Sequence, residues 1–311
     1  MVRGVAPEGA ASRPMVRRAA SEGATPGTSG RAGSDAGETG LPGDPAGRQP
    51  GWMITAAGRR ALVTGVSRRH GIGFAIAARL LADGASVFAQ SWTAHDAGQP
   101  WGADPAGIHG VLEALGGPGE RLAHAEYDLA LPEAPGELVA EAAGALGGLD
   151  TLVVNHARSS VAGLAALTAD ELDLCWAVNV RAALLLVQAF AGQFTDAEGR
   201  GGRVVLFTSG QHRAPMPGEI PYAATKGALH QLTGTLADAL ADRAITVNTV
   251  NPGPTDTGWA TAETAEQVAR AMPAGRWNTP GQAAGVVALL LGMDAATITG
   301  QVVDAEGGFR R

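Results

Sequence analysis

A tyrosine and a lysine four residues apart are the strongest chemical signal in the sequence. Tyr222 and Lys226 lie at the start of a segment that is predicted to be helical to about Ala241. Residues four apart project from the same face of a helix. A free phenol titrates near pH ~10, and a neighbouring ammonium group favours the phenolate and so lowers that pKa. The pair therefore predicts a general acid/base that works near neutral pH.

The lysine of this pair is unusual in this chain. Lys226 is the only lysine among the 23 Lys and Arg residues of the 311-residue sequence. Every other basic side chain of the two types is arginine, whose planar guanidinium differs from a compact ammonium group. The alternative interpretation is a Tyr–Lys pair that only decorates a helix. The placement of the single ammonium group at this spacing favours a chemical role.

A serine is expected to lie beside the pair. Ser209 follows the apolar run Val204–Thr208, thirteen residues before Tyr222. In a parallel sheet, the carboxyl ends of the strands border the ligand-binding crevice. A hydroxyl group at that edge would hold a carbonyl oxygen while Tyr222 donates a proton to it. Taken alone, Ser209 would be read as an ordinary turn residue.

A glycine-rich turn predicts a second kind of site. The run 64–73 follows the first predicted strand and precedes a predicted helix, Phe74–Ala82. Glycines let the backbone approach a pyrophosphate, and the N–H groups at a helix N-terminus attract it. Glycine-rich turns are common in a chain with 45 Gly, so the position between strand and helix carries the prediction. The residues predicted here to bind a dinucleotide cofactor are Gly65, Ser67, Arg68, Gly71, Ile72 and Gly73.

The end of the second predicted strand bears on which dinucleotide binds. NAD sites of this kind usually have an acid there that accepts hydrogen bonds from the ribose hydroxyls. The chain instead continues Gln-Ser-Trp over residues 90–92, and the next acid is Asp96. Arg68 and Arg69 in the glycine turn are placed to pair with a 2′-phosphate. NADP is favoured, with NAD as the alternative.

These groups need a scaffold, and the alternating pattern after Ile54 predicts one. Short apolar runs suited to buried parallel strands are separated by segments of helical periodicity. Seven such alternations predict a single doubly wound α/β domain of the Rossmann type, with a seven-stranded parallel sheet over residues 53–311. The runs are Ala61–Thr64, Ser86–Gln90, Ala123–Tyr127, Thr151–Val154, Val204–Thr208, Ile245–Val250 and Gln301–Asp304.

Helix starts and irregular stretches add detail to this scaffold. Thr168 and Glu171 have the spacing of a capping box, which opens a predicted helix to about Phe194. Two long stretches, Ser91–Gly107 and Thr255–Thr279, show no regular pattern. Loops of this length in a compact domain are usually functional.

Residues 1–52 differ in composition from the rest. Leu41 is the only Leu, Ile, Phe, Trp or Tyr among the first 50 residues, which are rich in Gly, Pro and Ala. Such a segment cannot bury enough apolar area to offset chain entropy, so we predict a disordered extension. The Arg-rich start suggests a transit peptide, against which Glu8 and Glu22 argue. A start codon assigned too far upstream, with Met53 as the true start, is the other interpretation.

Composition excludes several classes of protein. A net charge of −7 argues against a nucleic-acid partner. A single cysteine, Cys175, forms no internal disulfide and supplies no metal cluster, which favours a reducing, cytoplasmic location. No run approaches the ~18 consecutive apolar residues of a membrane span. We therefore expect no metal and no membrane partner.

Together these residues resemble the classical short-chain dehydrogenase/reductase family, from about Arg59 to Phe309. Asn179 precedes Ser209, Tyr222 and Lys226 in the order and spacing of the family's Asn-Ser-Tyr-Lys tetrad. The resemblance implies that Tyr222 is the general acid/base and that Ser209 orients the carbonyl. It implies that Lys226 binds the nicotinamide ribose and lowers the pKa of Tyr222. Asn179 would hold a water molecule in a proton relay.

The resemblance also implies further cofactor contacts and an activity. The additional contacts are Asp128 and Leu129 for the adenine, Asn155 after the fourth strand, and Pro252, Gly253, Thr255 and Thr257 on the nicotinamide side. The glycine turn is two residues longer than is usual in the family. The implied activity is NADPH-dependent reduction of a small-molecule carbonyl to an alcohol, similar to that of 3-oxoacyl carrier-protein reductases, in a homotetramer. The alternatives are an NAD-dependent alcohol dehydrogenase working in the oxidative direction and a non-catalytic dinucleotide-binding regulator.

Overall fold

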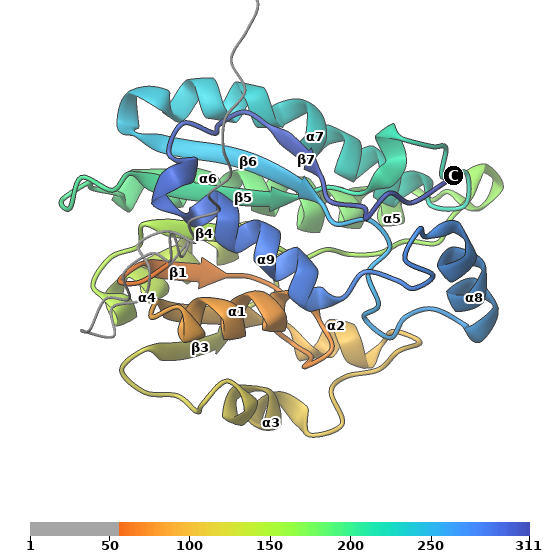
Figure 1. Cartoon of the computed structure of the whole chain (residues 1–311), viewed down its shortest axis with the longest axis horizontal. Coiled ribbons are helices and arrows are strands. Elements are labelled where there is room, and N and C mark those ends of the chain that lie inside the picture. The colour runs from red at the N-terminus through yellow and green to blue at the C-terminus, as the bar shows by residue number, and fades with distance from the viewer. Residues whose placement is uncertain (1–55) are drawn as a thin grey trace, which may run out of the picture. The chain divides into compact units, whose positions relative to one another are not determined.

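The computed structural model of the chain describes residues 56–311, and the predicted disordered extension at residues 1–52 lies outside the described residues. Seven parallel strands form one sheet in the order β3-β2-β1-β4-β5-β6-β7 (Figure 1). This confirms the predicted fold class. The strands are β1 Arg60–Val63, β2 Ser86–Ser91, β3 Leu122–Glu126, β4 Thr151–Val154, β5 Gly202–Phe207, β6 Ile245–Asn251 and β7 Val302–Asp304.

Helices cover both faces of the sheet (Figure 1). Successive residues of one strand alternate between two hydrophobic clusters, because side chains of a β-strand point to opposite faces. In β1, Leu62 belongs to the cluster with α4, α6 and α7, while Val63 belongs to the cluster with α1, α3 and α9. The helices are α1 Ile72–Ala82, α2 Thr93–Ala97, α3 Gly107–Ala114, α4 Ala134–Leu146, α5 Ala169–Trp176, α6 Ala182–Gln193, α7 Ile220–Leu240, α8 Ala262–Ala271 and α9 Pro280–Leu291.

The helix predicted from Thr168 to Phe194 is interrupted. A π-helical turn, Ala177–Arg181, lies between α5 and α6 and contains Asn179. Thr168 caps α5 as predicted, since its side chain accepts from the Glu171 N–H. The reciprocal half of the capping box is replaced by another contact, because the Glu171 carboxylate pairs with Arg158 at 2.8 Å. π-Helical turns often occur at functional sites.

The two stretches predicted to be irregular contain short helices. Residues 91–107 include α2, and residues 255–279 include α8. The stretch that contains α8 packs back on itself through Trp277, whose indole N–H donates to the Ala265 carbonyl at 2.8 Å. The rings of Trp259 and Trp277 pack edge to face at a centroid distance of 5.6 Å.

Within residues 56–311, one helical stretch is long and apolar enough to span a membrane by length and composition. It runs from Ala169 to Gln193 through the π-helical turn. In this fold its apolar side chains Leu186 and Phe190 are fully buried against the sheet. We therefore interpret it as a core helix.

The strand order reverses between β1 and β4, which pair side by side. The chain adds β2 and β3 on one side of β1 and β5, β6 and β7 on the other side of β4. In a doubly wound sheet, ligands bind at the carboxyl ends of the strands where this reversal occurs. The glycine turn after β1 and the segment from Asn155 after β4 meet at this point.

Candidate active site

The glycine turn after β1 has space only for glycine at two positions. Gly65 has φ +75°, and a Cβ added to it would lie 2.9 Å from the Asn155 Nδ2 atom. A Cβ on Gly73 would lie 2.3 Å from the Gly65 carbonyl oxygen. The Asn155 side chain holds the turn from the other side, since Nδ2 donates to the Thr64 carbonyl at 3.1 Å. The turn is thus packed backbone against backbone.

The start of α1 is open to an anion. Its N-cap, Gly71, has no side chain, and the first turn of the helix has no acidic residue. The free N–H groups at the positive end of the helix dipole therefore have no side-chain partner among the residues that the structure describes. A helix N-terminus with free N–H groups, directly after the glycine turn, fits the pyrophosphate of a dinucleotide cofactor.

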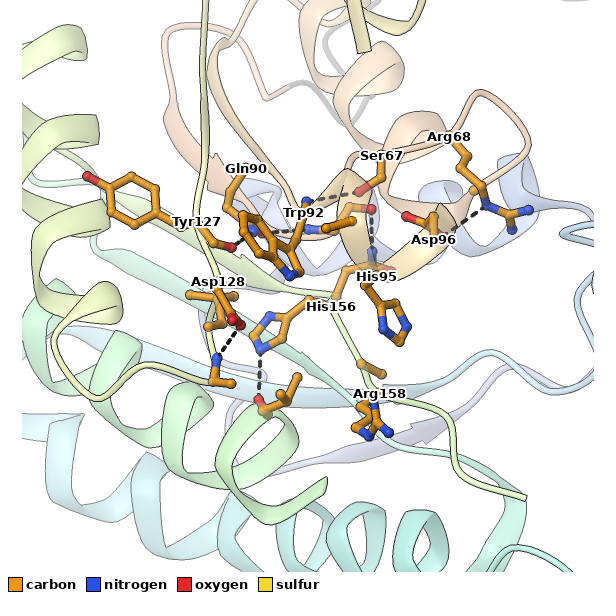
Figure 2. Close-up of a pocket in the computed structure, with 18 of the residues that line it drawn as sticks. Ser67, Arg68, Gln90, Trp92, His95, Asp96, Tyr127, Asp128, His156 and Arg158 are labelled. Carbon is orange, nitrogen blue, oxygen red and sulfur yellow. Dashed lines mark hydrogen bonds and ion pairs between the residues drawn. The ribbon is translucent and has the colours of Figure 1, made fainter. Parts of the chain in front are cut away.

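A cavity of about 430 Å³ lies next to this turn, between the ends of β1, β2 and β4 (Figure 2). Gln90 at the end of β2 fixes one wall. Its Oε1 atom accepts from the Gly65 N–H at 3.0 Å, and its Nε2 atom donates to the Tyr127 carbonyl at 2.9 Å. The predicted cofactor residues that line the cavity are Gly65, Ser67, Arg68, Gly71, Ile72, Asp128, Leu129, Asn155 and Thr257.

The two arginines of the glycine turn do different things. Arg69 was expected to pair with a 2′-phosphate, but its guanidinium and its backbone N–H bind Asp104 at 2.7–3.1 Å, and it does not line the cavity. Arg68 does line the cavity. Its Nη2 atom donates to the Thr257 carbonyl at 2.8 Å, and its Nε atom lies 3.4 Å from Asp96. It is therefore already engaged by the protein.

His156 joins the two central strand ends to the π-helical turn (Figure 2). Its Nε2 atom lies 2.9 Å from the Val178 carbonyl and its Nδ1 atom 2.8 Å from the Thr64 hydroxyl. Burial lowers the pKa of His156 to about 4, so the ring is neutral at pH 7. Because a carbonyl only accepts, Nε2 carries the proton and Nδ1 accepts from the hydroxyl of Thr64.

A second cavity, of about 590 Å³, contains the predicted reactive hydroxyls. Ser209 and Tyr222 both line it, and the Ser209 side chain acts to lower the pKa of the phenol. The two cavities share four lining residues, so they form neighbouring parts of one cleft. The shared residues are Arg68, Ile72, Trp101 and Thr257.

Lys226 lies behind Tyr222 in the protein interior. Its side chain is 2% exposed, its Nζ atom donates to the Phe207 carbonyl at 2.9 Å, and the same atom lies 5.6 Å from the centroid of the Tyr222 ring. Burial lowers the pKa of Lys226 to about 8. Burial also raises the pKa of Tyr222 to about 12, although the Ser209 hydrogen bond lowers it. Lys226 is not among the groups that shift this pKa, so the lowering expected from it is not seen in the protein alone.

Asn179 is fully enclosed and faces neither cavity. Its Nδ2 atom donates to the Arg158 carbonyl at 3.0 Å and to the Thr225 hydroxyl at 2.9 Å, and its Oδ1 atom accepts from the Arg158 N–H at 2.7 Å. Both amide protons are thus used by protein groups. The role of Asn179 in holding a relay water stays a prediction. The side chain ties the segment after β4 to α7.

The remaining predicted cofactor-binding residues either line the second cavity or fix the backbone next to a cavity. Gly73 packs behind the turn, as described above. Gly253 has φ +63°, and a Cβ there would lie 2.6 Å from the Glu306 Cα atom. Thr255 donates to the Gly253 carbonyl at 3.2 Å, which fixes the loop after β6. Those that line the second cavity are Pro252, Gly253, Thr255 and Thr257.

Three side chains that support the site were not predicted from the sequence. They are Gln90, His156 and Asp104, which bind the glycine turn or the π-helical turn. Only Gln90 could have been found from the sequence, because it lies at the end of a predicted strand, where the ligand-binding edge of the sheet is expected. Within residues 56–311, no group of three or more His, Cys, Asp or Glu side chains is arranged to hold a metal ion.

Comparisons with known proteins agree with this geometry. Residues 59–268 match the profile of the family described as short chain dehydrogenase. An uncharacterized oxidoreductase, YjdA, of Bacillus subtilis is 38% identical over 81% of this chain and 96% of its own length. An NADPH-dependent aldehyde reductase-like chloroplastic protein of Arabidopsis thaliana is 31% identical over 82% of this chain and 96% of its own. The structure of a short chain dehydrogenase of Burkholderia cenocepacia in complex with NADP is 36% identical, with a TM-score of 0.70, over 81% of this chain and 98% of that one.

Proposed function

Because the chain belongs to the short-chain dehydrogenase/reductase family, we propose that it is an NADP-dependent reductase that converts a carbonyl to an alcohol. The observation that carries the proposal is that the hydroxyls of Ser209 and Tyr222 line a cavity next to the glycine turn. Two hydroxyls that face one cavity suit a carbonyl oxygen, which accepts two hydrogen bonds.

Tyr222 is the proton donor in this reaction. A pKa of about 12 keeps the phenol protonated at neutral pH, so it is available as an acid. As the carbonyl oxygen gains charge in the transition state, the phenol transfers its proton. The Lys226 ammonium, 5.6 Å from the ring centroid, then stabilises the phenolate that remains. Bound NADPH supplies the hydride that the carbonyl carbon gains.

Ser209 orients the substrate, and Asn179 orients the protein around it. The Ser209 hydroxyl donates to the carbonyl oxygen and so fixes its position relative to the phenol. Asn179 acts as a positioning residue, because it binds the backbone of Arg158 and the Thr225 side chain that precedes Lys226. Displacement of this amide would move α7, and with it the side chains of Tyr222 and Lys226.

NADP as the cofactor is supported from three sides. The end of β2 has Gln90 and Ser91 in place of an acid, and Arg68 lines the adjacent cavity. The Burkholderia relative was crystallised with NADP, and the Arabidopsis relative is named for NADPH. A 2′-phosphate would have to draw the Arg68 guanidinium away from Asp96, 3.4 Å from it. Gly65, Gly71, Asn155 and the start of α1 would hold the pyrophosphate and its neighbours.

A thermal-shift comparison of NADPH and NADH tests the cofactor assignment. We expect NADPH to raise the melting temperature more than NADH at equal concentration, since only NADPH offers a 2′-phosphate to Arg68. Oxidation of NADPH over ketones, aldehydes and 3-oxoacyl thioesters then tests the reaction. Greater stabilisation by NADH would overturn the assignment and support an NAD-dependent alcohol dehydrogenase. Dinucleotide binding without turnover of any carbonyl would support a regulator.

We further propose a homotetramer, as in the family that the sequence resembles, located in the cytoplasm. The outward face of α5 carries Leu172 and Trp176, which are 39% and 50% exposed in the single chain. Exposed apolar side chains on neighbouring turns of a helix suit a subunit interface. Light scattering of the purified protein tests this assembly, and a monomer would contradict it.

A further inference from the structure

Glu219 stands at the edge of the reactive cavity and has no partner among residues 56–311. It lies three residues before Tyr222, at the N-cap of α7, and its side chain forms no capping hydrogen bond there. It lines the same cavity as Ser209 and Tyr222. Its charge also raises the pKa of Tyr222, which places the carboxylate within electrostatic reach of the proposed acid.

The other charged side chains of this cavity are paired. Glu306 accepts from Asn251 at 2.8 Å and from the Arg311 Nη1 atom at 2.8 Å. Arg68 donates to the Thr257 carbonyl. No hydrogen bond or ion pair engages the Glu219 side chain within the part of the chain that the structure describes. Burial alone raises its pKa, with no cation that acts in the opposite sense.

The rest of the cavity wall is largely apolar. It includes three tryptophans, Trp101, Trp259 and Trp277, and also Met216 and Phe309. An apolar ligand would therefore cover most of the wall, and the Glu219 carboxylate would lose contact with water when that ligand binds. A carboxylate that loses water without gaining a partner opposes binding. A ligand that supplies a cation or an N–H donor removes this cost.

We propose that Glu219 determines substrate specificity: it selects carbonyl compounds that carry a protonated amine or another hydrogen-bond donor beside an apolar body, and it rejects carbonyl compounds that carry a carboxylate or phosphate. The inference rests on the proposed carbonyl reduction for the reaction, but it concerns binding. A hydrogen bond to a charged group contributes enough to change affinity by roughly 10- to 100-fold.

Aryl ketones that differ in a single ring substituent test the proposal. The set is acetophenone with an aminomethyl, a methyl or a carboxylate group, in both the meta and para positions. With NADPH saturating at pH 7.5, we expect kcat/KM to be highest for the aminomethyl compound and lowest for the carboxylate. Glu219→Gln should remove about tenfold or more of the advantage of the amine over the methyl compound. Glu137→Gln changes an exposed carboxylate on α4 and should leave the order as it is.

Binding of the same ketones separates this inference from the proposed reaction. Tyr222→Phe loaded with NADPH allows dissociation constants to be measured by calorimetry without turnover. If the amine binds best and Glu219→Gln in that background abolishes the preference, the inference stands even when the wild-type enzyme reduces none of these ketones. Equal binding of all three substituents, a preference that survives Glu219→Gln, or no binding of any of them would overturn it. Melting temperatures show whether each variant is folded.

Discussion

The Nζ atom of Lys226 lies 5.6 Å from the centroid of the Tyr222 ring while it donates a 2.9 Å hydrogen bond to the Phe207 carbonyl. The ammonium is thus anchored to the end of β5 and is 2% exposed. This places a fixed positive charge behind the phenol, where no solvent competes for it. The arrangement depends on a slim side chain that ends in a compact charge.

Lys226→Arg should keep the charge and lose the activity. The guanidinium is broader than the ammonium group and has no free space at a site that is already enclosed. We expect kcat/KM for carbonyl reduction to fall by about 100-fold or more, the usual contribution of acid–base catalysis. Steady-state NADPH oxidation measures kcat/KM. Arg270→Lys, which makes the opposite substitution at an exposed position on α8, is the control. A fully active Lys226→Arg enzyme would show that the reaction does not require a lysine at this position.

Tyr222→Phe should separate binding from chemistry. The substitution removes the proton donor and leaves the ring, so turnover is lost while NADPH still binds. Fluorescence titration gives the dissociation constant, and NADPH oxidation gives the rate. Tyr127→Phe is the matched control, because the Tyr127 hydroxyl bonds Glu141 at 2.8 Å and points away from the cavity (Figure 2). Activity retained in Tyr222→Phe would refute the proposed acid.

The pH dependence of kcat/KM should report Lys226. The pKa of Lys226 is about 8 and that of Tyr222 about 12, so the lysine loses its charge first as the pH rises. Reduction needs the ammonium and the protonated phenol, and kcat/KM reflects groups of the free enzyme. We therefore expect kcat/KM to decline as the pH rises through about 8. A profile that stays flat to pH 10 would contradict this assignment.

Acid stability should depend on His156. Its pKa is about 4 in the folded protein and near ~6.5 in an unfolded chain, so the unfolded state binds more protons between these values. The contribution of the neutral ring is fully present above pH ~6.5 and is lost as the pH falls toward 4. We expect His156→Ala to lower the melting temperature at pH 7.5 and to flatten its fall over this window. His109→Ala, at an exposed position on α3, should do neither.

Gly73→Ala should weaken dinucleotide binding. The added Cβ would lie 2.3 Å from the Gly65 carbonyl oxygen, so the glycine turn must open to accommodate it. We expect the NADPH dissociation constant to rise by at least tenfold, measured by fluorescence titration on protein whose circular dichroism is unchanged. Gly136→Ala, where an added Cβ meets nothing within 4 Å, controls for the change of residue type. Unchanged NADPH binding would show that this packing does not shape the cofactor site.

The strands were predictable because a parallel sheet buries both faces of each strand. All seven apolar runs correspond to strands, with bounds that differ by at most two residues at either end. The clustering of Ser209 and Tyr222 followed from the same topology, since carboxyl ends of parallel strands gather at one edge. The π-helical turn at Ala177–Arg181 was not predictable, because its residues continue the helical periodicity on both sides.

The sequence by itself determined the sheet, the glycine turn and the order of the reactive residues, because these depend on local spacing and on the alternation of apolar runs. The tertiary structure alone decided which charges are used. Arg69 binds Asp104, Glu171 binds Arg158 and Glu306 binds Arg311, while Glu219 lines the cavity with no partner in the described part of the chain. Such pairings depend on which side chains the fold brings within a few ångströms of each other, and charge–charge interactions weaken steeply with distance and exposure to water.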